Sequence, residues 1–423
     1  MKRLIVAALM LVLILSCAGG AARAGEMTTL TFQIDSDMSL DGFKAVAALA
    51  EEKLGIRIEY EMRVGGTEGD NIVKTRLASG DMADICGYNP GSLLNALHPE
   101  DYFADLSGYG WTERLTEEYR TCATSGDCLF GIPMTSMQVG AVVYSRPLYE
   151  KYRLEIPRTW DEFVSNCNVL KQAGEIPVIG AFADTWTSQV LFLGDYFNLL
   201  SGAPDFARRF EAGTAKYADT PSALRSFEKY SDLIGLYNED YLATTYDDAV
   251  DMLAEGRGGH WFILSQCLSN VYSLYGKEAV DSLGLFGIPA DAGETGLVVW
   301  MPTSMYANKN SENLDAVLKF FEFYLTDEAL DAFVGAQLPD GPFCVEGYEP
   351  PKAAYRAVAE DMQAYFDAGL THMAMEFETA VKGANCMGIC VEVASGQINA
   401  YEAARMYDDD CLKQAIQLGL DWR

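Results

Sequence analysis

The residues that could do chemistry in this chain are carboxylates, an amide and aromatic rings that lie in or just after segments with strand-like character. They are Asp35, Tyr88, Asn89, Asp184, Trp186, Trp261 and Trp300. Carboxylates and amides can hydrogen-bond two neighbouring hydroxyls of a sugar, and an aromatic ring can stack on the apolar face of a pyranose. We therefore expect these residues to line a site for a polyhydroxylated ligand, with Asp184 and Trp186 as its central pair.

Each of these residues also has a structural role open to it. A tryptophan can pack in a core or between lobes, and Asp35 or Asp184 can cap the N-terminus of a helix. Trp160 is expected to pack, because it opens an amphipathic helix directly after its Thr159 cap. Glu68, in a glycine-rich stretch, is interpreted as part of a solvated turn.

The sequence contains no recognisable catalytic motif. It has no Gly-x-Ser-x-Gly, no His-Glu-x-x-His and no phosphate-binding glycine loop followed by Lys-Ser/Thr. A secreted glycosidase with paired carboxylates is the alternative function, although 61 acidic residues always offer some plausible pair. We predict no catalytic residues.

A metal site or cofactor is not predicted either. The acidic cluster of Asp35, Asp37 and Asp41 misses the spacing of a calcium loop and its late glutamate. The three histidines are far apart in the sequence, and no Cys-x-x-Cys occurs.

The charge of the chain excludes some classes of partner. Its 423 residues include 31 Lys and Arg against 61 Asp and Glu, a formal net charge of −30. Such a surface repels phosphate backbones and anionic head groups, so nucleic-acid binding and electrostatic membrane binding are not expected. The length predicts two or three domains.

Residues 1–16 have the pattern of an export signal. Lys2 and Arg3 precede an apolar run over 4–15, which is shorter than the roughly 20 residues that span a bilayer. Ile14-Leu15-Ser16-Cys17 resembles a bacterial lipobox, which predicts acylation at Cys17 and a tether over 17–26. Cleavage after Ala24 is the alternative. We expect the mature protein on the extracellular face of the cytoplasmic membrane, anchored by lipid alone.

Nine cysteines remain after Cys17, so at least one thiol stays unpaired if the others form disulfides. Cys122 and Cys128 flank a short turn and are the best candidate disulfide. Cys386 and Cys390 share one face of a predicted helix, and Cys411 could join them. An extracellular location permits disulfides, and the pairing itself stays open.

The elements that must position the candidate residues alternate between strands and helices. The predicted strands are 29–34, 56–62, 83–88, 176–181 and 260–264, and the predicted helices are 42–54, 71–78, 159–172, 247–255, 313–324 and 326–334. The β-α-β-α-β order of the first five elements implies a parallel sheet covered by helices. In such sheets, ligands bind beyond the carboxyl ends of the strands.

One pentapeptide, Leu-Phe-Gly-Ile-Pro, occurs twice, at 129–133 and 285–289. Each copy ends an apolar segment and precedes a β-rich stretch, over 139–144 and 297–306. Because proline removes a ladder donor, a strand commonly ends or changes sheet there. The two copies therefore suit a chain that crosses between two lobes.

The order of several segments resembles that of the extracellular solute-binding proteins of ATP-driven carbohydrate importers, the group that includes maltose-binding protein. Pro157-Arg158-Thr159-Trp160-Asp161-Glu162-Phe163 is similar to a Pro-x-Thr-Trp-x-Glu-Phe signature of that family. The other matching segments are 73–85, 130–133, 142–145, 148–152, 247–258, 326–330 and 393–397.

The resemblance implies an α/β, two-lobed periplasmic-binding-protein-like (type II) fold, in which each lobe is a β-sheet flanked by helices and hinge strands join the lobes. Lobe 1 is expected over 27–133 and 290–340, and lobe 2 over 134–289 and 341–423, with hinges at the two Phe-Gly-Ile-Pro copies. The implied function is capture of a sugar or oligosaccharide by a monomer, which delivers it to ABC-transporter permease subunits. A structural adhesin is disfavoured by the α/β rhythm and the absence of repeats.

Overall fold

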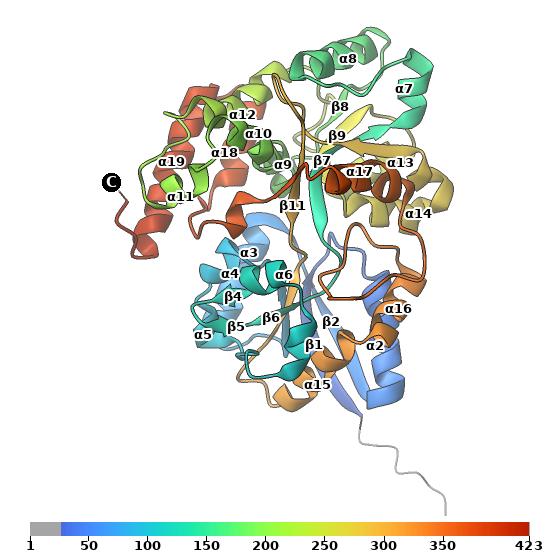
Figure 1. Cartoon of the computed structure of the whole chain (residues 1–423), viewed down its shortest axis with the longest axis vertical. Coiled ribbons are helices and arrows are strands. Elements are labelled where there is room, and N and C mark those ends of the chain that lie inside the picture. Colours follow the sequence, from blue (N-terminus) through green and yellow to red (C-terminus); the bar gives the residue numbers. More distant parts are fainter. Residues whose placement is uncertain (1–26, 423) are drawn as a thin grey trace, which may run out of the picture.

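The computed structural model describes residues 27–422, which fold into two α/β lobes, each built around its own sheet (Figure 1). Cys17, Ala24 and the export signal lie outside the described residues. No helix within 27–422 combines the length and the hydropathy needed to cross a membrane. The predicted α/β class and two-lobed architecture are confirmed.

The first sheet contains five strands in the order β2-β1-β3-β12-β6. The strands are β1 (Thr28–Asp35), β2 (Ile56–Arg63), β3 (Ile85–Tyr88), β6 (Gly131–Pro133) and β12 (Ser304–Ala307). β1 runs parallel to β2 and β3, and β12 runs antiparallel to β3 and β6. The alternation of Leu30, Phe32 and Ile34 places three buried side chains in the core that contains Phe43 and Phe320.

Helices cover both faces of this sheet in the first lobe. They are α2 (Asp41–Leu54), α3 (Gly66–Ser79), α4 (Ser92–Asn95), α5 (Pro99–Tyr102), η1 (Gly110–Arg114), α6 (Glu117–Cys122), α15 (Leu314–Tyr324) and α16 (Asp327–Ala336). A short hairpin of β4 (Thr124–Ser125) and β5 (Cys128–Leu129) lies beside them. Glu68, which the sequence placed in a turn, is an exposed residue of α3.

The second sheet is centred on β7, which pairs with β9, β10 and β11, all antiparallel. Its strands are β7 (Gln138–Ser145), β8 (Val178–Ile179), β9 (His260–Leu264), β10 (Leu283–Phe286), β11 (Leu297–Trp300) and β13 (Thr371–Met373). Every residue of β7 is buried, because Ala141 and Val143 face one helical layer while Val142 and Tyr144 face the other.

The helices of the second lobe come from the middle and the end of the chain. They are α7 (Arg146–Tyr152), α8 (Trp160–Gln172), η2 (Thr185–Gln189), α9 (Val190–Gly194), α10 (Tyr196–Gly202), α11 (Phe206–Glu211), α12 (Pro221–Asp232), α13 (Tyr246–Ala254), α14 (Cys267–Asp281), the π-helical η3 (Ala357–Met362), α17 (Gln363–Asp367), η4 (Met375–Phe377), α18 (Cys386–Ala394) and α19 (Ala400–Gln417). The Thr159 cap forms as predicted, since its hydroxyl accepts the Glu162 N–H, and Trp160 is buried.

The chain passes between the sheets at places that differ in part from the predicted hinges. One crossing is residues 134–137, between β6 and β7, directly after the first Phe-Gly-Ile-Pro copy. The second copy is not a crossing, because β10 pairs with β7 and the chain returns to the same sheet as β11. The actual crossing is 301–303, so the assignment of 290–300 to lobe 1 is wrong.

The last crossing also lies later than predicted. Cys344 and Val345 are buried in the core of the first lobe, whereas Tyr355 is buried in the second. The boundary at 341 is therefore wrong, and the chain leaves the first lobe between Val345 and Tyr355. Turn residues occur both at Pro339-Asp340-Gly341-Pro342 and at Pro350-Pro351, so the local sequence does not show at which of them the chain leaves the first lobe.

The predicted disulfide between Cys122 and Cys128 is not formed, because all nine cysteines of residues 27–422 are free thiols. Cys122 ends α6 and is buried, with its Sγ 3.5 Å from the Met373 Sδ. The Cys128 thiol lies beside the Asp105 carboxylate, which raises its pKa. The two side chains thus turn to different partners on either side of the β4–β5 hairpin.

Candidate ligand-binding site

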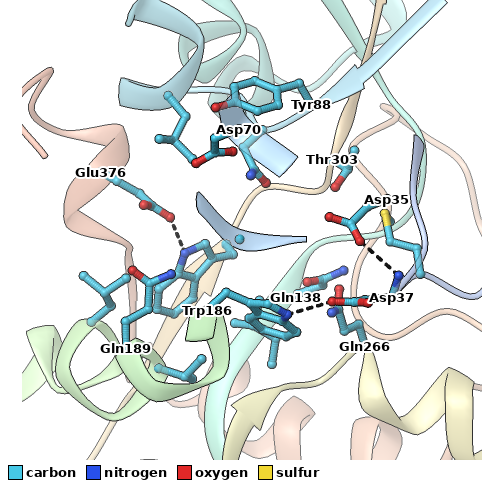
Figure 2. Close-up of a pocket in the computed structure, with 18 of the residues that line it drawn as sticks. Asp35, Asp37, Asp70, Tyr88, Gln138, Trp186, Gln189, Gln266, Thr303 and Glu376 are labelled. Atoms are coloured by element: carbon cyan, nitrogen blue, oxygen red, sulfur yellow. Dashed lines mark hydrogen bonds between the residues drawn. The ribbon is translucent and has the colours of Figure 1, made fainter. Parts of the chain in front are cut away.

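A cavity of about 140 Å³ lies between the two sheets and is lined by both lobes (Figure 2). Three aromatic residues line it: Tyr88, Trp186 and Trp300. The charged and hydrogen-bonding residues of its lining are Asp35, Asp37, Arg63, Asp70, Asn89, Gln138, Gln189, Gln266, Thr303, Glu376 and Lys382. The cavity thus combines flat aromatic surfaces with groups that bind hydroxyls or charges.

The first lobe contributes an ion pair held by strand register. Asp35 and Arg63 end the parallel strands β1 and β2 and are register partners. The Arg63 Nη1 donates to Asp35 Oδ2 at 3.1 Å, and the Arg63 guanidinium lies 5.8 Å from the centroid of the Tyr88 ring. Burial raises the pKa of Asp35, although the Arg63 charge opposes this shift.

Asp37 connects the two lobes directly. Its backbone N–H donates to Asp35 Oδ1 at 3.0 Å, and its Oδ2 accepts the indole N–H of Trp186 at 2.8 Å. Trp186 belongs to η2 of the second lobe, where its ring packs on Tyr246 with centroids 5.3 Å apart. Burial, followed by the charge of Asp35, raises the pKa of Asp37 to about 6.

Trp300, Glu376 and Lys382 form the second-lobe wall. The Trp300 indole N–H donates to Glu376 Oε1, and Lys382 Nζ donates to Glu376 Oε2. The Lys382 and Glu376 side chains are only 9% and 11% exposed. A Cβ on Gly140 of β7 would lie 2.5 Å from Trp300 Cζ3, so the absence of a side chain there makes room for the indole.

Three buried polar atoms of the lining lack a hydrogen-bond partner within residues 27–422, namely Gln189 Oε1, Arg63 Nε and the Tyr88 hydroxyl. Gln189 and Arg63 are each 8% exposed, and Tyr88 is 1% exposed. A buried polar atom without a partner costs free energy, so native structures generally satisfy such atoms with protein, water or ligand. Gln189 and Arg63 therefore offer an acceptor and a donor to a molecule in the cavity.

The lobes touch on two sides of the cavity. Gly66, with a φ of +68°, comes so close to η2 that an added Cβ would lie 3.4 Å from Thr185 Oγ1. At Gly91, with a φ of +71°, an added Cβ would lie 2.7 Å from the Glu376 carbonyl oxygen. Both positions need glycine for their backbone conformation. The structure is therefore a form in which the two lobes are in contact around the cavity.

Five of the seven predicted ligand-binding residues line this cavity: Asp35, Tyr88, Asn89, Trp186 and Trp300. Asp184 does not, because its Oδ2 accepts the backbone N–H of Tyr246 at 2.6 Å and caps the first turn of α13. Trp261 is 1% exposed in the core of the second lobe, since β9 directs it toward α13 and α14. Asp184 and Trp261, which were predicted to bind the ligand, therefore do not line this cavity.

Several lining residues were not predicted. Arg63 ends a predicted strand, and Asp37 lies two residues beyond Asp35, so the strand-end rule could have found both. Gln138 and Thr303 lie at the crossings between the sheets, which the sequence located only in part. Asp70, Gln189, Gln266, Glu376 and Lys382 come from helices or loops, and no local pattern marks them.

Comparisons with known proteins place this geometry in a family. The family model described as bacterial extracellular solute-binding protein matches residues 39–331. The multiple sugar-binding protein of Streptococcus mutans serotype c is 20% identical over 306 residues, which cover 67% of this chain and 68% of that protein.

Solved structures show the same fold. A chitin oligosaccharide binding protein superposes with a TM-score of 0.78 at 17% identity, covering 93% of this chain and 100% of the other. The solute-binding protein RafE in complex with raffinose gives a TM-score of 0.73 at 17% identity, covering 92% and 100%. Because the family model matches well over half of the sequence, this chain belongs to the bacterial extracellular solute-binding proteins.

Proposed function

We propose that this protein binds a sugar in the cavity between its lobes and delivers it to the permease of an ATP-driven importer. The observation that carries the proposal is the lining, in which two indoles and a phenol from both lobes surround carboxylates, amides and a guanidinium. Aromatic rings stack on the apolar faces of pyranoses, and the polar groups pair with their hydroxyls. The relatives named for sugars support the same ligand class.

The size of the cavity favours a small sugar. Its volume of about 140 Å³ is below the roughly 300–1,000 Å³ of sites for drug-sized ligands. The contacts of Gly66 with Thr185 and of Gly91 with Glu376 limit the space on two sides. In this form of the protein, a monosaccharide or disaccharide fits the proposal better than a long oligosaccharide.

Binding is proposed to act by closing the lobes. A ligand that contacts both lobes favours the closed form by the difference between its affinities for the closed and open forms. The closed form would then dock on the permease, and lipid attachment at Cys17 would keep the protein near it. Replacement of Cys17 by Ser should release the protein from the membrane fraction, and retention of that variant would contradict the anchor.

The experiment is thermal unfolding of the purified protein with a panel of neutral monosaccharides, disaccharides, trisaccharides, polyols and amino acids. A ligand at 100 times its dissociation constant should add about 2.7 kcal/mol to the free energy of unfolding. Isothermal titration of any stabilising sugar should then show a Kd about tenfold weaker for Trp300→Ala, because a stacking surface is lost. Trp111→Ala, outside the cavity, is the matched control.

Two outcomes would contradict the proposal. A panel in which no sugar stabilises the protein, while another solute does, would move the site to a different ligand class. Release of a hydrolysed product from a bound oligosaccharide would favour the glycosidase alternative.

A further inference from the structure

The cavity contains more negative than positive side chains. Four carboxylates line it, Asp35, Asp37, Asp70 and Glu376, against the two cations Arg63 and Lys382. Figure 2 shows Asp35 and Asp37 on one side of the space and Asp70 and Glu376 on the other. A molecule bound between them is therefore flanked by carboxylates in two directions.

Each of the two cationic side chains forms an ion pair with one of the four carboxylates. Arg63 pairs with Asp35, and Lys382 pairs with Glu376, and all four side chains are largely buried. Among residues 27–422, no ion pair within 4.0 Å involves Asp37 or Asp70. The lining thus carries two carboxylates in excess.

The groups near Asp37 and Asp70 compensate only part of their negative charge. Asp37 accepts one indole N–H, and Asp70 lies beside the Tyr88 hydroxyl and within reach of the Lys382 charge. The first turn of α3, at Gly66, adds the partial positive charge of a helix N-terminus, equivalent to about half an elementary charge. These contributions are smaller than two full charges.

The raised pKa values of two lining carboxylates agree with this surplus of negative charge. Burial raises the pKa of both Asp35 and Asp37, and the neighbouring carboxylates Asp70 and Asp35 add to the respective shifts. Even the Arg63 guanidinium does not return the pKa of Asp35 to its ordinary value. A positive charge placed in this space would relieve repulsion that the protein itself leaves in place.

An independent observation indicates a ligand that donates hydrogen bonds. Gln189 is more than nine-tenths buried, lines the cavity, and its Oε1 has no partner within the described chain. With Asp37 and Asp70, which have no ion pair among the described residues, Gln189 gives the lining three such acceptor side chains, against two unpartnered donors, Arg63 Nε and the Tyr88 hydroxyl. An ammonium group supplies three donors and no acceptor, whereas a carboxylate on the ligand supplies none.

We infer that the cavity selects its ligand by charge, and that it prefers a sugar carrying a protonated amino group to the neutral sugar and rejects the corresponding acidic sugar. This inference rests on the proposed function, because it refines the class of sugar bound at the same site. Asp37 and Asp70 are the residues that set the preference. The charges of Arg63 and Lys382 are each paired with a carboxylate, so the lining formed by residues 27–422 has no uncompensated positive charge for an anionic ligand.

The test is isothermal titration of the full chain at pH 7.5 and low salt with three matched sets of probes. Each set contains a neutral hexose, its 2-amino-2-deoxy derivative and its uronate, for D-glucose, D-galactose and D-mannose. In the set with the best-fitting ring, the amine should bind at least tenfold tighter than the neutral hexose, and the uronate at least tenfold weaker. The preference should decline at 0.5 M salt.

Asp37→Asn and Asp70→Asn each keep the side-chain shape and remove one charge. In either variant the ratio of amine to neutral affinity should fall severalfold, whatever happens to the affinities themselves. Asp315→Asn removes the same charge from exposed α15, outside the cavity, and should leave the ratio unchanged. Equal ratios in the cavity variants and in this control would overturn the assignment to Asp37 and Asp70.

The outcomes separate this inference from the function on which it rests. Binding of a neutral hexose with no preference for its amine overturns charge selection and leaves sugar binding standing. Tighter binding of the uronate overturns it as well. Failure of all nine probes, together with failure of the neutral panel, overturns both.

Discussion

Asp37 both lines the cavity and makes a hydrogen bond between the lobes. It accepts the Trp186 indole N–H from the other lobe while lying next to the Asp35 carboxylate. Asp37 therefore helps to hold the lobes together, while burial and the Asp35 charge disfavour its ionised form. The pH dependence of the free energy of unfolding can measure this unfavourable contribution.

The pKa of Asp37, about 6 in the folded protein, lies above its ordinary value of 3.8. The folded protein then binds this proton more tightly than the unfolded chain, so the Asp37 contribution to the free energy of unfolding is present at low pH. It declines between about pH 4 and pH 6 and is absent above that range. Asp37→Asn lacks this titration, and its free energy of unfolding relative to the wild type should rise by on the order of 1 kcal/mol from pH 4 to pH 7.

Urea unfolding at several pH values measures this difference. Burial also raises the pKa of Asp408 to about 6, but Asp408 is present in both proteins and cancels. A difference that stays constant from pH 4 to pH 7 would show that Asp37 does not titrate in this window.

The residues of the site were predictable where a strand delivers them and not where tertiary packing does. Asp35 ends a strand with alternating apolar residues, and Tyr88 and Asn89 end or follow a short, fully buried strand. Asp184 follows a strand as well, but its carboxylate accepts a hydrogen bond from the Tyr246 backbone N–H of α13 and does not reach the cavity. Glu376 and Lys382 reach the cavity because the C-terminal part of the chain packs against the second sheet through β13. The local sequence around these two residues does not predict that packing.

At the scale of elements, the second lobe contains a fully buried ion pair that ties α12 to the turn between α9 and α10. Lys229 and Asp195 are each 1% exposed, and Lys229 also donates to the Pro289 carbonyl oxygen at 2.8 Å. Asp195 further accepts the Ser226 hydroxyl at 2.8 Å. Pro289 is the end of the second Phe-Gly-Ile-Pro copy, so this contact holds that segment inside the second lobe.

Lys229→Met should therefore lower the free energy of unfolding by about 3–5 kcal/mol, because it leaves the Asp195 charge buried without its partner. Urea unfolding with unchanged m-value is the measurement. Lys53→Met removes an exposed pair with Glu328 and should cost less than about 1 kcal/mol. The double variant Lys229→Met with Asp195→Asn should recover part of the loss, and no recovery would argue that Lys229 acts through packing instead.

The sequence predicts most helices and strands correctly, but it predicts less well to which lobe each of them belongs. The helical periodicity over 42–54 and 313–324 finds α2 and α15 to within one residue at each end. Proline after an apolar segment marks the end of a strand, but it does not show which sheet the next strand joins. The sheet is decided by the pairing of β10 and β11 with β7, a strand about 140 to 160 residues earlier in the chain, so local sequence places the second hinge wrongly.

At the scale of the whole molecule, the lobes are linked by chain crossings and by a few polar contacts that ligand binding would reinforce. Besides the Trp186–Asp37 bond, the Ser273 hydroxyl of α14 donates to Asp41 Oδ2 of α2 at 2.7 Å. The Gln337 amide donates to Ser269 Oγ at 3.2 Å. The Ser39 and Ser273 hydroxyls lie 3.3 Å apart, and Asn270 Nδ2 donates to the Asp37 carbonyl oxygen at 3.4 Å. Because such contacts exist only while the lobes meet, removal of one should shift the balance toward the open form.

Trp186→Phe keeps a ring against Tyr246 and removes the indole N–H that Asp37 accepts. Without sugar, the variant should have a larger radius of gyration than the wild type in small-angle X-ray scattering, because its open form gains population. With saturating sugar the two proteins should have the same radius, since the ligand supplies contacts to both lobes. The Kd should weaken about tenfold, in line with the loss of one hydrogen bond to a charged group. Trp111→Phe, outside the cavity, should change neither quantity. An unchanged radius for ligand-free Trp186→Phe would mean that the other contacts alone keep the lobes closed.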